Sequence, residues 1–321
     1  MSKKALVLGI DEYPECPLCG CVNDAKNVAS LLERNADGSK NFDTICLTNQ
    51  KSKRKLENAI RTLFQNDDDI ALLYFSGHGS RVDESEYICV PNETNGIDKI
   101  QLSDVLKIIH KSKCKNKIVI LDSCFSGGMG DNPFDGDCAS LAKGVTILSA
   151  SRENESAAES NGHGVFTSLL CGALNGGAAD LLGHITPGAV YAYIDKALGS
   201  WQQRPVFKTN VQEFISLRET MPPIALKELI AIKEIFSDCD SINLDPSFEF
   251  TNNPNERHDY IKPFANEDNV KKMKLLQKFE RVGLVEPVDE EHMYFAAMHS
   301  KACRLTPLGL YYKSLSKDNR F

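Results

Sequence analysis

The sequence predicts an α/β fold built on a mainly parallel sheet, followed by a smaller region with a different pattern. Over the first 215 of 321 residues, short apolar runs alternate with segments of helical spacing. The apolar runs are continuous, as expected for strands that are covered on both faces. After about residue 216 this alternation stops. We therefore expect a three-layer α/β domain over residues 1–215, a helix and linker region over 216–268, and a small α+β domain over 269–321.

The expected elements follow one another in a regular order. Strands are predicted at residues 4–10, 43–49, 69–77, 117–124 and 144–151, and helices at 23–35, 52–65, 102–112, 164–174 and 186–200. Thr186 is a plausible N-cap with Pro187 at the first helical position. Pro205 cannot donate a hydrogen bond to a β-ladder, so residues 203–209 are predicted to form an edge strand. The connection between Cys124 and residue 144 is rich in Gly and Asp and is expected to be functional.

Composition limits the class of protein. A net charge of −7 disfavours a protein that mainly coats nucleic acid. No apolar stretch approaches the about 18 residues of a membrane span, so no membrane association is expected. The first residues read as a strand and not as an export signal. Eleven cysteines without such a signal indicate a reducing cytoplasm.

Reactive side chains follow two of the predicted strands directly. One strand ends in Ser76-Gly77-His78-Gly79, and another ends in Asp122-Ser123-Cys124. Because parallel strands deliver their carboxyl ends to one edge of a sheet, neighbouring strands would place His78 and Cys124 at one crevice. An imidazole beside a thiol promotes the thiolate and later protonates the leaving amine. The backbone N–H groups of Gly79 and Cys124 would then face the developing oxyanion.

Each of these residues has a simpler alternative reading. A cysteine after an apolar strand is usually a small buried hydrophobe, and a histidine between glycines is often a turn residue. Their occurrence together, 46 residues apart and each at a strand end, favours a nucleophilic site. A phosphatase reading of Cys124 is disfavoured, because no arginine follows it at phosphate-loop spacing.

The segments "YFSGHGS" and "LDSCFSGG" resemble the histidine and cysteine motifs of the metacaspases, within the caspase-like cysteine peptidases. In caspases the histidine precedes the cysteine by roughly 50 residues. The resemblance covers residues 1 to about 215 and implies a caspase-like fold. It also implies an endopeptidase with His78 and Cys124 as catalytic dyad and with no cofactor required for the chemistry. Animal caspases carry Gln-Ala-Cys at the nucleophile, whereas this chain has Asp-Ser-Cys, which bears on specificity.

The same resemblance implies an acidic specificity pocket. Asp24 and Asp122 match the acids that receive arginine or lysine before the scissile bond, and Cys21 and Ser76 match further parts of the pocket wall. Two carboxylates can bind a guanidinium group at both of its edges. The expected substrate is therefore a protein or peptide with Arg or Lys before the cut. The alternative for Asp24 is helix capping, and for Asp122 a turn at the strand end.

Calcium and self-cleavage are further implications of the resemblance. Many metacaspases need Ca²⁺, and Asp104 and Asp131 fall near matching positions. Ser103 and Asn92 stand where the family often has acids, so calcium dependence stays open. Lys143 is the one basic residue between Cys124 and the next strand, which makes it the expected autocleavage site. A solvated loop lysine is the alternative.

The C-terminal 53 residues, 269–321, resemble a winged-helix module in their order of helices and strands. They contain ten Lys or Arg against six Asp or Glu, a surplus of four positive charges. Because there is no arginine cluster and no interleaving with aromatic residues, docking of a regulatory protein partner is favoured over nucleic-acid binding. The sequence is compatible with two functions. The first is a cytoplasmic peptidase that is latent until activated, and the second is a non-catalytic or DNA-bound regulator on the same scaffold.

Overall fold

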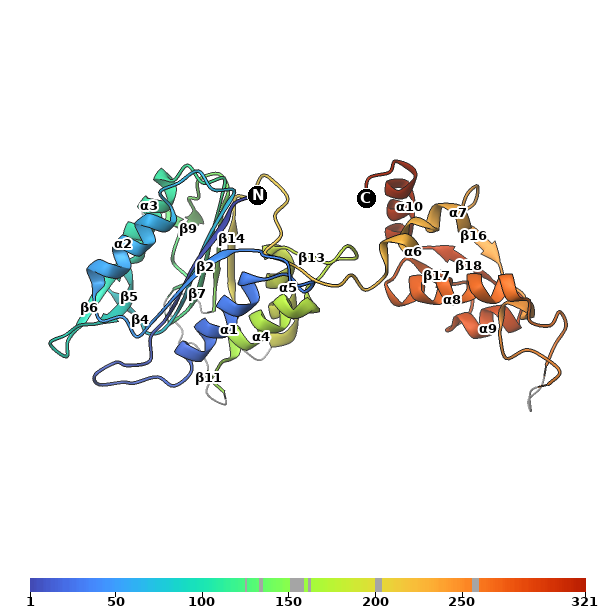
Figure 1. Cartoon of the computed structure of the whole chain (residues 1–321), viewed down its shortest axis with the longest axis horizontal. Coiled ribbons are helices and arrows are strands. Elements are labelled where there is room, and N and C mark those ends of the chain that lie inside the picture. Colours follow the sequence, from blue (N-terminus) through green and yellow to red (C-terminus); the bar gives the residue numbers. More distant parts are fainter. Residues whose placement is uncertain (125, 133–134, 151–158, 161–162, 200–203, 256–259) are drawn as a thin grey trace. The chain divides into compact units, whose positions relative to one another are not determined.

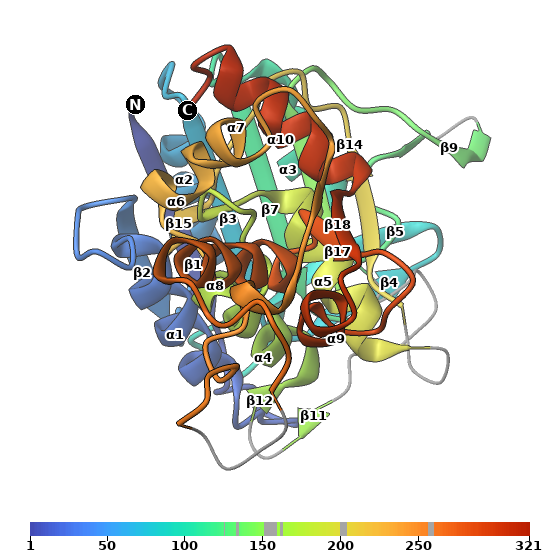
Figure 2. The same cartoon turned by 90° about the vertical axis from the view of Figure 1, so that its right-hand side faces the viewer.

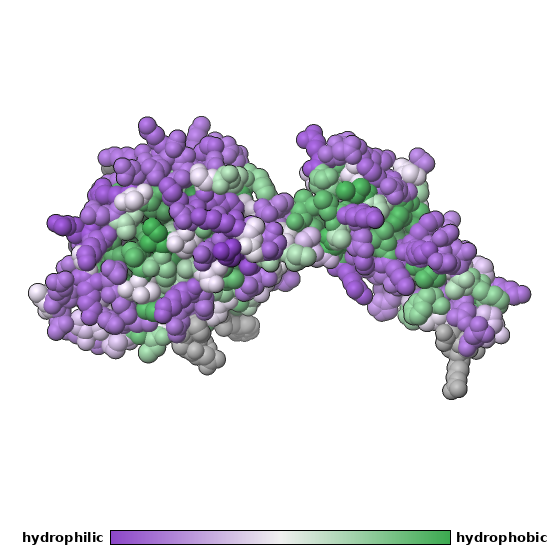
Figure 3. Space-filling model, viewed as in Figure 1, coloured by the Kyte–Doolittle hydropathy of each residue, from purple (hydrophilic) through white to green (hydrophobic). Residues whose placement is uncertain are grey.

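The computed structural model describes residues 1–124, 126–132, 135–150, 159–160, 163–199, 204–255 and 260–321. The chain divides into two compact units, residues 1–221 and 222–321, and each is described by itself. Hydrophilic residues predominate on the face of each unit that Figure 3 shows, with smaller hydrophobic areas between them. Among the described residues, no helix combines the length and the apolar character that crossing a membrane requires.

A six-stranded sheet forms the centre of the first unit (Figure 1). The strand order is β14-β10-β7-β3-β1-β2, in which only β14 runs antiparallel to its neighbour. The strands are β1 (Lys3–Gly9), β2 (Asp43–Thr48), β3 (Ile70–Ser76), β7 (Asn116–Asp122), β10 (Val145–Ser149) and β14 (Val206–Thr209). The predicted α/β class, the five parallel strands and the edge strand after Pro205 are confirmed.

Helices cover both faces of this sheet, which gives the three layers. The helices are α1 (Cys21–Glu33), α2 (Lys53–Leu63), α3 (Leu102–Lys111), α4 (Val165–Gly172), which continues into the π-helical turn η1 (Ala173–Gly177), and α5 (Pro187–Leu198). Helices α2 and α3 pack on one face, and α1, α4 and α5 pack on the other (Figure 1). The predicted cap of α5 is confirmed, since the Thr186 hydroxyl accepts a hydrogen bond of 3.1 Å from the amide of Ala189.

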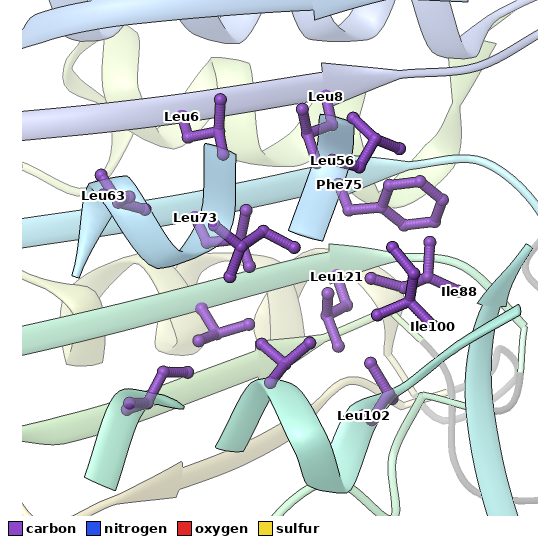
Figure 4. Close-up of a cluster of buried hydrophobic side chains, with 14 of the residues drawn as sticks. Leu6, Leu8, Leu56, Leu63, Leu73, Phe75, Ile88, Ile100, Leu102 and Leu121 are labelled. Atoms are coloured by element: carbon purple, nitrogen blue, oxygen red, sulfur yellow. The ribbon is translucent and has the colours of Figure 1, made fainter. Parts of the chain in front are cut away.

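The alternation of side chains along each strand explains the two cores. Leu6 and Leu8 of β1 face α2, whereas Val7 between them faces α1. Figure 4 shows the first of these cores, in which Leu73 and Phe75 of β3 lie beside the side chains of β1 and β7. A strand buried on both sides needs apolar residues at every position, which is why the sequence shows continuous runs.

Short antiparallel pairs complete the first unit, and the sequence did not predict them. They are β4 (Gly79–Val82), β5 (Ser85–Pro91) and β6 (Ile97–Gln101) in one three-stranded sheet, and the pairs β8 (Asp131–Asn132) with β9 (Asp135–Ala139), β11 (Glu159–Ser160) with β12 (His163–Gly164), and β13 (His184–Ile185) with β15 (Arg218–Glu219). Strand β4 begins directly after His78, so this histidine joins the central sheet to the β4–β5–β6 sheet.

The second unit is a small three-stranded sheet with helices, seen from a second side in Figure 2. Its elements are α6 (Leu226–Ile230), α7 (Ile232–Ile235), β16 (Ser241–Asn243), the 3₁₀ turn η2 (Pro246–Phe248), α8 (Glu267–Arg281), β17 (Val285–Pro287), α9 (Met293–Met298), β18 (Ala302–Leu305) and α10 (Pro307–Lys317). The strand order is β16-β18-β17, and both pairs are antiparallel. Assignment of this unit to the winged-helix class stays a prediction.

Residues 222–268, most of the predicted helix and linker or ordered-loop region, belong to the second unit. Strand β16 pairs with β18, so this region contributes to the same sheet as the C-terminal residues. Asn252 is fully buried, and its Nδ2 donates to the carbonyl groups of Pro246, Ile261 and Pro263 at 3.0, 2.8 and 3.0 Å. A polar side chain of this segment thus binds backbone groups inside the fold.

Candidate active site

The register of the two central strands places the predicted dyad at one edge of the sheet. Strands β3 and β7 are parallel neighbours, and Ser76 lies opposite Asp122. The amide of Gly77 donates to the carbonyl group of Asp122 at 3.3 Å, which continues this pairing past the strand ends. His78 and Cys124 are each two residues beyond the paired Ser76 and Asp122, and both are half-buried. The condition under which the sequence placed the two residues at one crevice, that their strands are neighbours, is met.

The glycines on either side of His78 each make a contact that leaves no space for a side chain. A Cβ atom at Gly79 would lie 2.0 Å from the carbonyl oxygen of Cys124. A Cβ atom at Gly77 would lie 2.5 Å from the hydroxyl oxygen of Tyr13. The first contact brings the backbone of the histidine segment against that of the cysteine. The Gly-His-Gly sequence is therefore explained by two close approaches.

The imidazole ring of His78 is oriented by a backbone carbonyl group. Its Nε2 lies 2.7 Å from the carbonyl oxygen of Cys16. A carbonyl oxygen can only accept, so Nε2 carries the proton and Nδ1 is the basic nitrogen of the neutral ring. This tautomer is the one that can take a proton through Nδ1.

The hydroxyl of Tyr13 contacts the backbone of His78 from the other side. It accepts a hydrogen bond from the His78 amide at 2.9 Å and donates to the carbonyl oxygen of Cys89 at 3.2 Å. The rings of Tyr13 and His78 meet edge to face, with centroids 4.5 Å apart. Sequence reasoning missed both Tyr13 and the Cys16 carbonyl. Their position directly after β1, which neighbours β3, was the one available signal.

The four predicted pocket residues converge. Asp24 and Asp122 are buried, with exposed fractions of 2% and 6%. A Cβ atom at Gly164 would lie 2.4 Å from Oδ2 of Asp122 and 3.4 Å from Oδ2 of Asp24, so both carboxylates face one glycine. Cys21 and Ser76 are also buried and hydrogen-bonded to each other. Burial, followed by the charges of Asp11, Asp122 and Asp24, raises the pKa of the Cys21 thiol, and the bond from Ser76 opposes this only in part.

Donors from α4 and the segment before it hold the two carboxylates. The Thr167 hydroxyl donates to Oδ2 of Asp122 at 2.6 Å, and the Gly164 amide donates to Oδ2 of Asp24 at 3.0 Å. The hydroxyl groups of Tyr74 and Thr167 are also 2.6 Å apart, which extends the network into the core. Sequence reasoning missed these partners.

Helix capping by Asp24 is the alternative that the structure disfavours. The first amides of α1 are bound by Asp11, whose two carboxylate oxygens accept from Cys21 at 2.8 Å and from Val22 at 3.2 Å. Asp11 thus fulfils the role of an N-cap from a distance in sequence. The carboxylate of Asp24 is turned to Gly164 instead.

The two candidate calcium ligands have lysine partners. Asp104 lies on α3 and binds Lys107 at 2.9 Å, and both side chains are exposed. Asp131 pairs with Lys208. Within the described part of the chain, no three His, Cys, Asp or Glu side chains are grouped so that they could hold a metal ion. These two residues, with their lysine partners, do not fit a calcium site, and the question of calcium dependence stays open.

Lys208 of β14 instead binds the segment that follows the nucleophile. Its ammonium group donates to the carbonyl oxygens of Gly127 at 2.7 Å and Met129 at 3.2 Å, in addition to its pair with Asp131. One cation thus holds three oxygens of the loop that begins after Cys124. Lys143 is exposed near the end of this connection, as an autocleavage site requires.

Comparison with known proteins gives one family for the first unit. Residues 2–211 match the family model described as "Caspase domain". Metacaspase-1A of Neurospora crassa is 29% identical over 156 residues, which are 41% of this chain and 33% of that protein. Metacaspase-1 of Botryotinia fuckeliana is 24% identical over 205 residues, 56% of this chain and 46% of that protein. The chain thus spans less than half the length of these curated relatives.

Solved structures with the same fold have low sequence identity. A protein from Geobacter sulfurreducens superposes with a TM-score of 0.52 at 20% identity, over 69% of this chain and 98% of that one. Caspase-1 from Spodoptera frugiperda gives a TM-score of 0.50 at 13% identity, over 68% of this chain and 90% of that one. The expected caspase-like architecture of the first unit is confirmed.

Proposed function

Because this chain belongs to the caspase-domain family and is metacaspase-like, we propose that it is a cysteine endopeptidase that cuts proteins after arginine or lysine. One observation carries the proposal. The ends of β3 and β7 deliver His78 and Cys124 to one edge of the sheet, beside two buried carboxylates. The chemistry and the specificity follow from these two pairs of residues.

The peptide bond is cleaved in two steps. Nδ1 of His78 takes the thiol proton of Cys124, and the thiolate attacks the scissile carbonyl carbon. The amides of Gly79 and Cys124 stabilise the resulting oxyanion. When the C–N bond breaks, the imidazolium returns its proton to the leaving amine, and the acyl group stays on sulfur. Water, deprotonated by His78, then hydrolyses the thioester and restores the thiol. The Cys16 carbonyl oxygen accepts the hydrogen bond from Nε2–H throughout. Nδ1 therefore remains the nitrogen that takes and returns protons.

The specificity follows from the charge of the pocket. Asp24 and Asp122 are nearly excluded from water, and their carboxylates favour a cationic side chain in the pocket over a neutral or acidic one. A neutral or acidic side chain could not form the charge-assisted hydrogen bonds that these carboxylates offer, and such a site can disfavour a substrate by roughly 10⁴-fold. Arginine can bind both carboxylates with its fork of donors.

The remaining parts of the proposal concern control of the enzyme. We propose that it is latent in the cytoplasm, that a signal or a protein partner docked on the second unit activates it, and that it cuts itself after Lys143. The exposure of Lys143 supports the last point. The hydrogen bond from the Gly164 amide to Asp24 supports latency. A substrate side chain that enters the pocket has to share the Asp24 carboxylate with this amide or displace the amide from it.

Hydrolysis of fluorogenic peptides ending in Arg, Lys or Asp, in calcium or in EGTA, tests the proposal. Cleavage after Arg and Lys is expected, and it should be lost in Cys124→Ala and His78→Ala. Cys114→Ala is the matched control, because this buried thiol lies two residues before the start of β7, at the opposite end of the strand from Cys124. Asp122→Asn should lower cleavage after Arg by at least about 10-fold. Cleavage after Asp alone would exclude the acidic pocket.

The second candidate, a non-catalytic or DNA-bound regulator, gives a different result. It predicts no hydrolysis of any peptide, alkylation of Cys124 that does not depend on His78, and binding of DNA by the full chain.

A further inference from the structure

We propose that Tyr13 is the residue that positions His78 for catalysis, through its hydroxyl group. The proposal rests on the Cys124–His78 dyad proposed above. Tyr13 lies in the loop between β1 and α1, 65 residues before the histidine, and its hydroxyl binds the backbone of His78 and Cys89. Its role is therefore one of positioning.

The hydroxyl replaces one hydrogen bond of a β-ladder. Strands β4 and β5 pair with Gly79 opposite Ile88, so the next pair of residues is His78 and Cys89. On one side of this pair the bond is direct, from the Cys89 amide to the His78 carbonyl at 3.0 Å. On the other side the Tyr13 hydroxyl stands between the His78 amide and the Cys89 carbonyl, at 2.9 and 3.2 Å. Tyr13 thus closes the ladder at the residue that carries the base.

The surroundings of the hydroxyl keep it in this place. Tyr13 is 3% exposed, and burial raises its pKa well above the usual range, so it remains a phenol that both donates and accepts. Gly77 leaves the space that the hydroxyl oxygen occupies, since a Cβ atom there would lie 2.5 Å away. The ring edge meets the imidazole at 4.5 Å between centroids and limits its rotation.

His78 depends on such support because of its place in the chain. It follows the end of β3 at Ser76 and precedes the start of β4 at Gly79, so it lies between two sheets and is a regular member of neither. A displacement of about 1 Å in a reacting group can cost about 100-fold in rate. Removal of the hydroxyl leaves the His78 amide and the Cys89 carbonyl to find new partners, and the histidine moves with them.

Tyr13→Phe tests the role, with Tyr191→Phe as control. Tyr191 stacks on Phe207, with ring centroids 5.0 Å apart, and lies on α5 away from the dyad. For an arginine peptide, Tyr13→Phe should lower kcat by about 10- to 100-fold with KM within about twofold. The pH dependence of Cys124 alkylation by iodoacetamide, read by mass spectrometry, should shift towards that of His78→Ala. A purely structural role would lower Tm and leave this alkylation profile unchanged.

A measurement on the wild-type protein keeps the test valid if the variant does not fold. Amide exchange followed by NMR should show the His78 N–H protected to the level of the β4–β5 ladder. Rapid exchange there, or a folded Tyr13→Phe variant with wild-type kcat and alkylation profile, would overturn the proposal. Alkylation and exchange need no substrate. A wild-type protein that cleaves none of the peptides would therefore contradict the proposed peptidase and still decide the role of Tyr13.

Discussion

Gly79 lies against Cys124 so closely that a Cβ atom at residue 79 would be 2.0 Å from the Cys124 carbonyl oxygen. The neighbour is backbone and not a flexible side chain, so it cannot turn away. The contact links the segment of the proposed base to that of the proposed nucleophile.

Gly79→Ala should therefore separate the two reactive groups. We expect kcat/KM for an arginine peptide to fall at least about 100-fold, because the added methyl group has to push the Cys124 backbone away. Gly188→Ala is the matched control, since the nearest atom to a Cβ there is the Thr186 hydroxyl oxygen at 4.0 Å. Full activity of a folded Gly79→Ala protein would mean that the cysteine segment adjusts without cost.

Thr167→Val should weaken the specificity pocket. The variant keeps the shape of the side chain but removes the donor to Asp122 and the hydrogen bond between Thr167 and the Tyr74 hydroxyl. We expect KM for arginine substrates to rise about 10-fold, because a hydrogen bond to a buried charge is lost. Thr146→Val is the control, as this buried hydroxyl pairs with Thr209 in the sheet. Equal KM values for both variants would show that Thr167 does not contribute to the specificity pocket.

Lys208→Met should release the loop after the nucleophile. We expect the free energy of unfolding of the first unit to fall by about 2 kcal/mol, since three oxygens of the loop lose the largely buried ammonium group that binds them. Amide exchange over residues 127–131 should also become faster. Lys107→Met, in which an exposed lysine loses its pair with Asp104, should cost at most about 0.5 kcal/mol by urea unfolding. A similar loss in both variants would show that the loop is held by other contacts.

Cys171 gives a prediction for alkaline pH. Burial, with a further contribution from Asp24, raises its pKa from 9.0 to about 11. Between these values the unfolded chain loses the proton and the folded chain keeps it, so this stabilisation is complete below pH 9 and is lost as pH rises towards 11. From urea unfolding at each pH, Cys171→Ala should lose stability less steeply than wild type over this window, by at most about 1.4 kcal/mol per pH unit. Parallel curves would contradict the raised pKa.

The sequence predicted those parts of the molecule that depend on local pattern. Continuous apolar runs identified the strands of the central sheet, and the rule for strand ends placed His78 and Cys124 at one edge of it. The supports of the site depend on contacts between distant segments, which no local pattern records. Thr167 reaches Asp122 across 45 residues, and Lys208 reaches Asp131 across 77.

The packing of residues 222–268 within the second unit could not be predicted for a related reason. Asparagine in a sequence indicates a turn or a loop because its side chain can replace backbone hydrogen bonds. Asn252 does this in the interior of the second unit, where it binds three carbonyl groups. Composition cannot distinguish such a buried amide from one in a solvated linker, since an asparagine side chain can bind backbone groups in either place.

The loop between β1 and α1 supports both halves of the site. Tyr13 and the Cys16 carbonyl contact His78, while Asp11 holds the start of the helix that carries Cys21 and Asp24. In the proposed peptidase, a change in this loop would therefore alter substrate preference and turnover together. A chimaera that received this loop from a relative with another substrate preference would also acquire a different position of the His78 imidazole. Attempts to change the substrate preference should therefore begin at Thr167 and Gly164 and leave the loop intact.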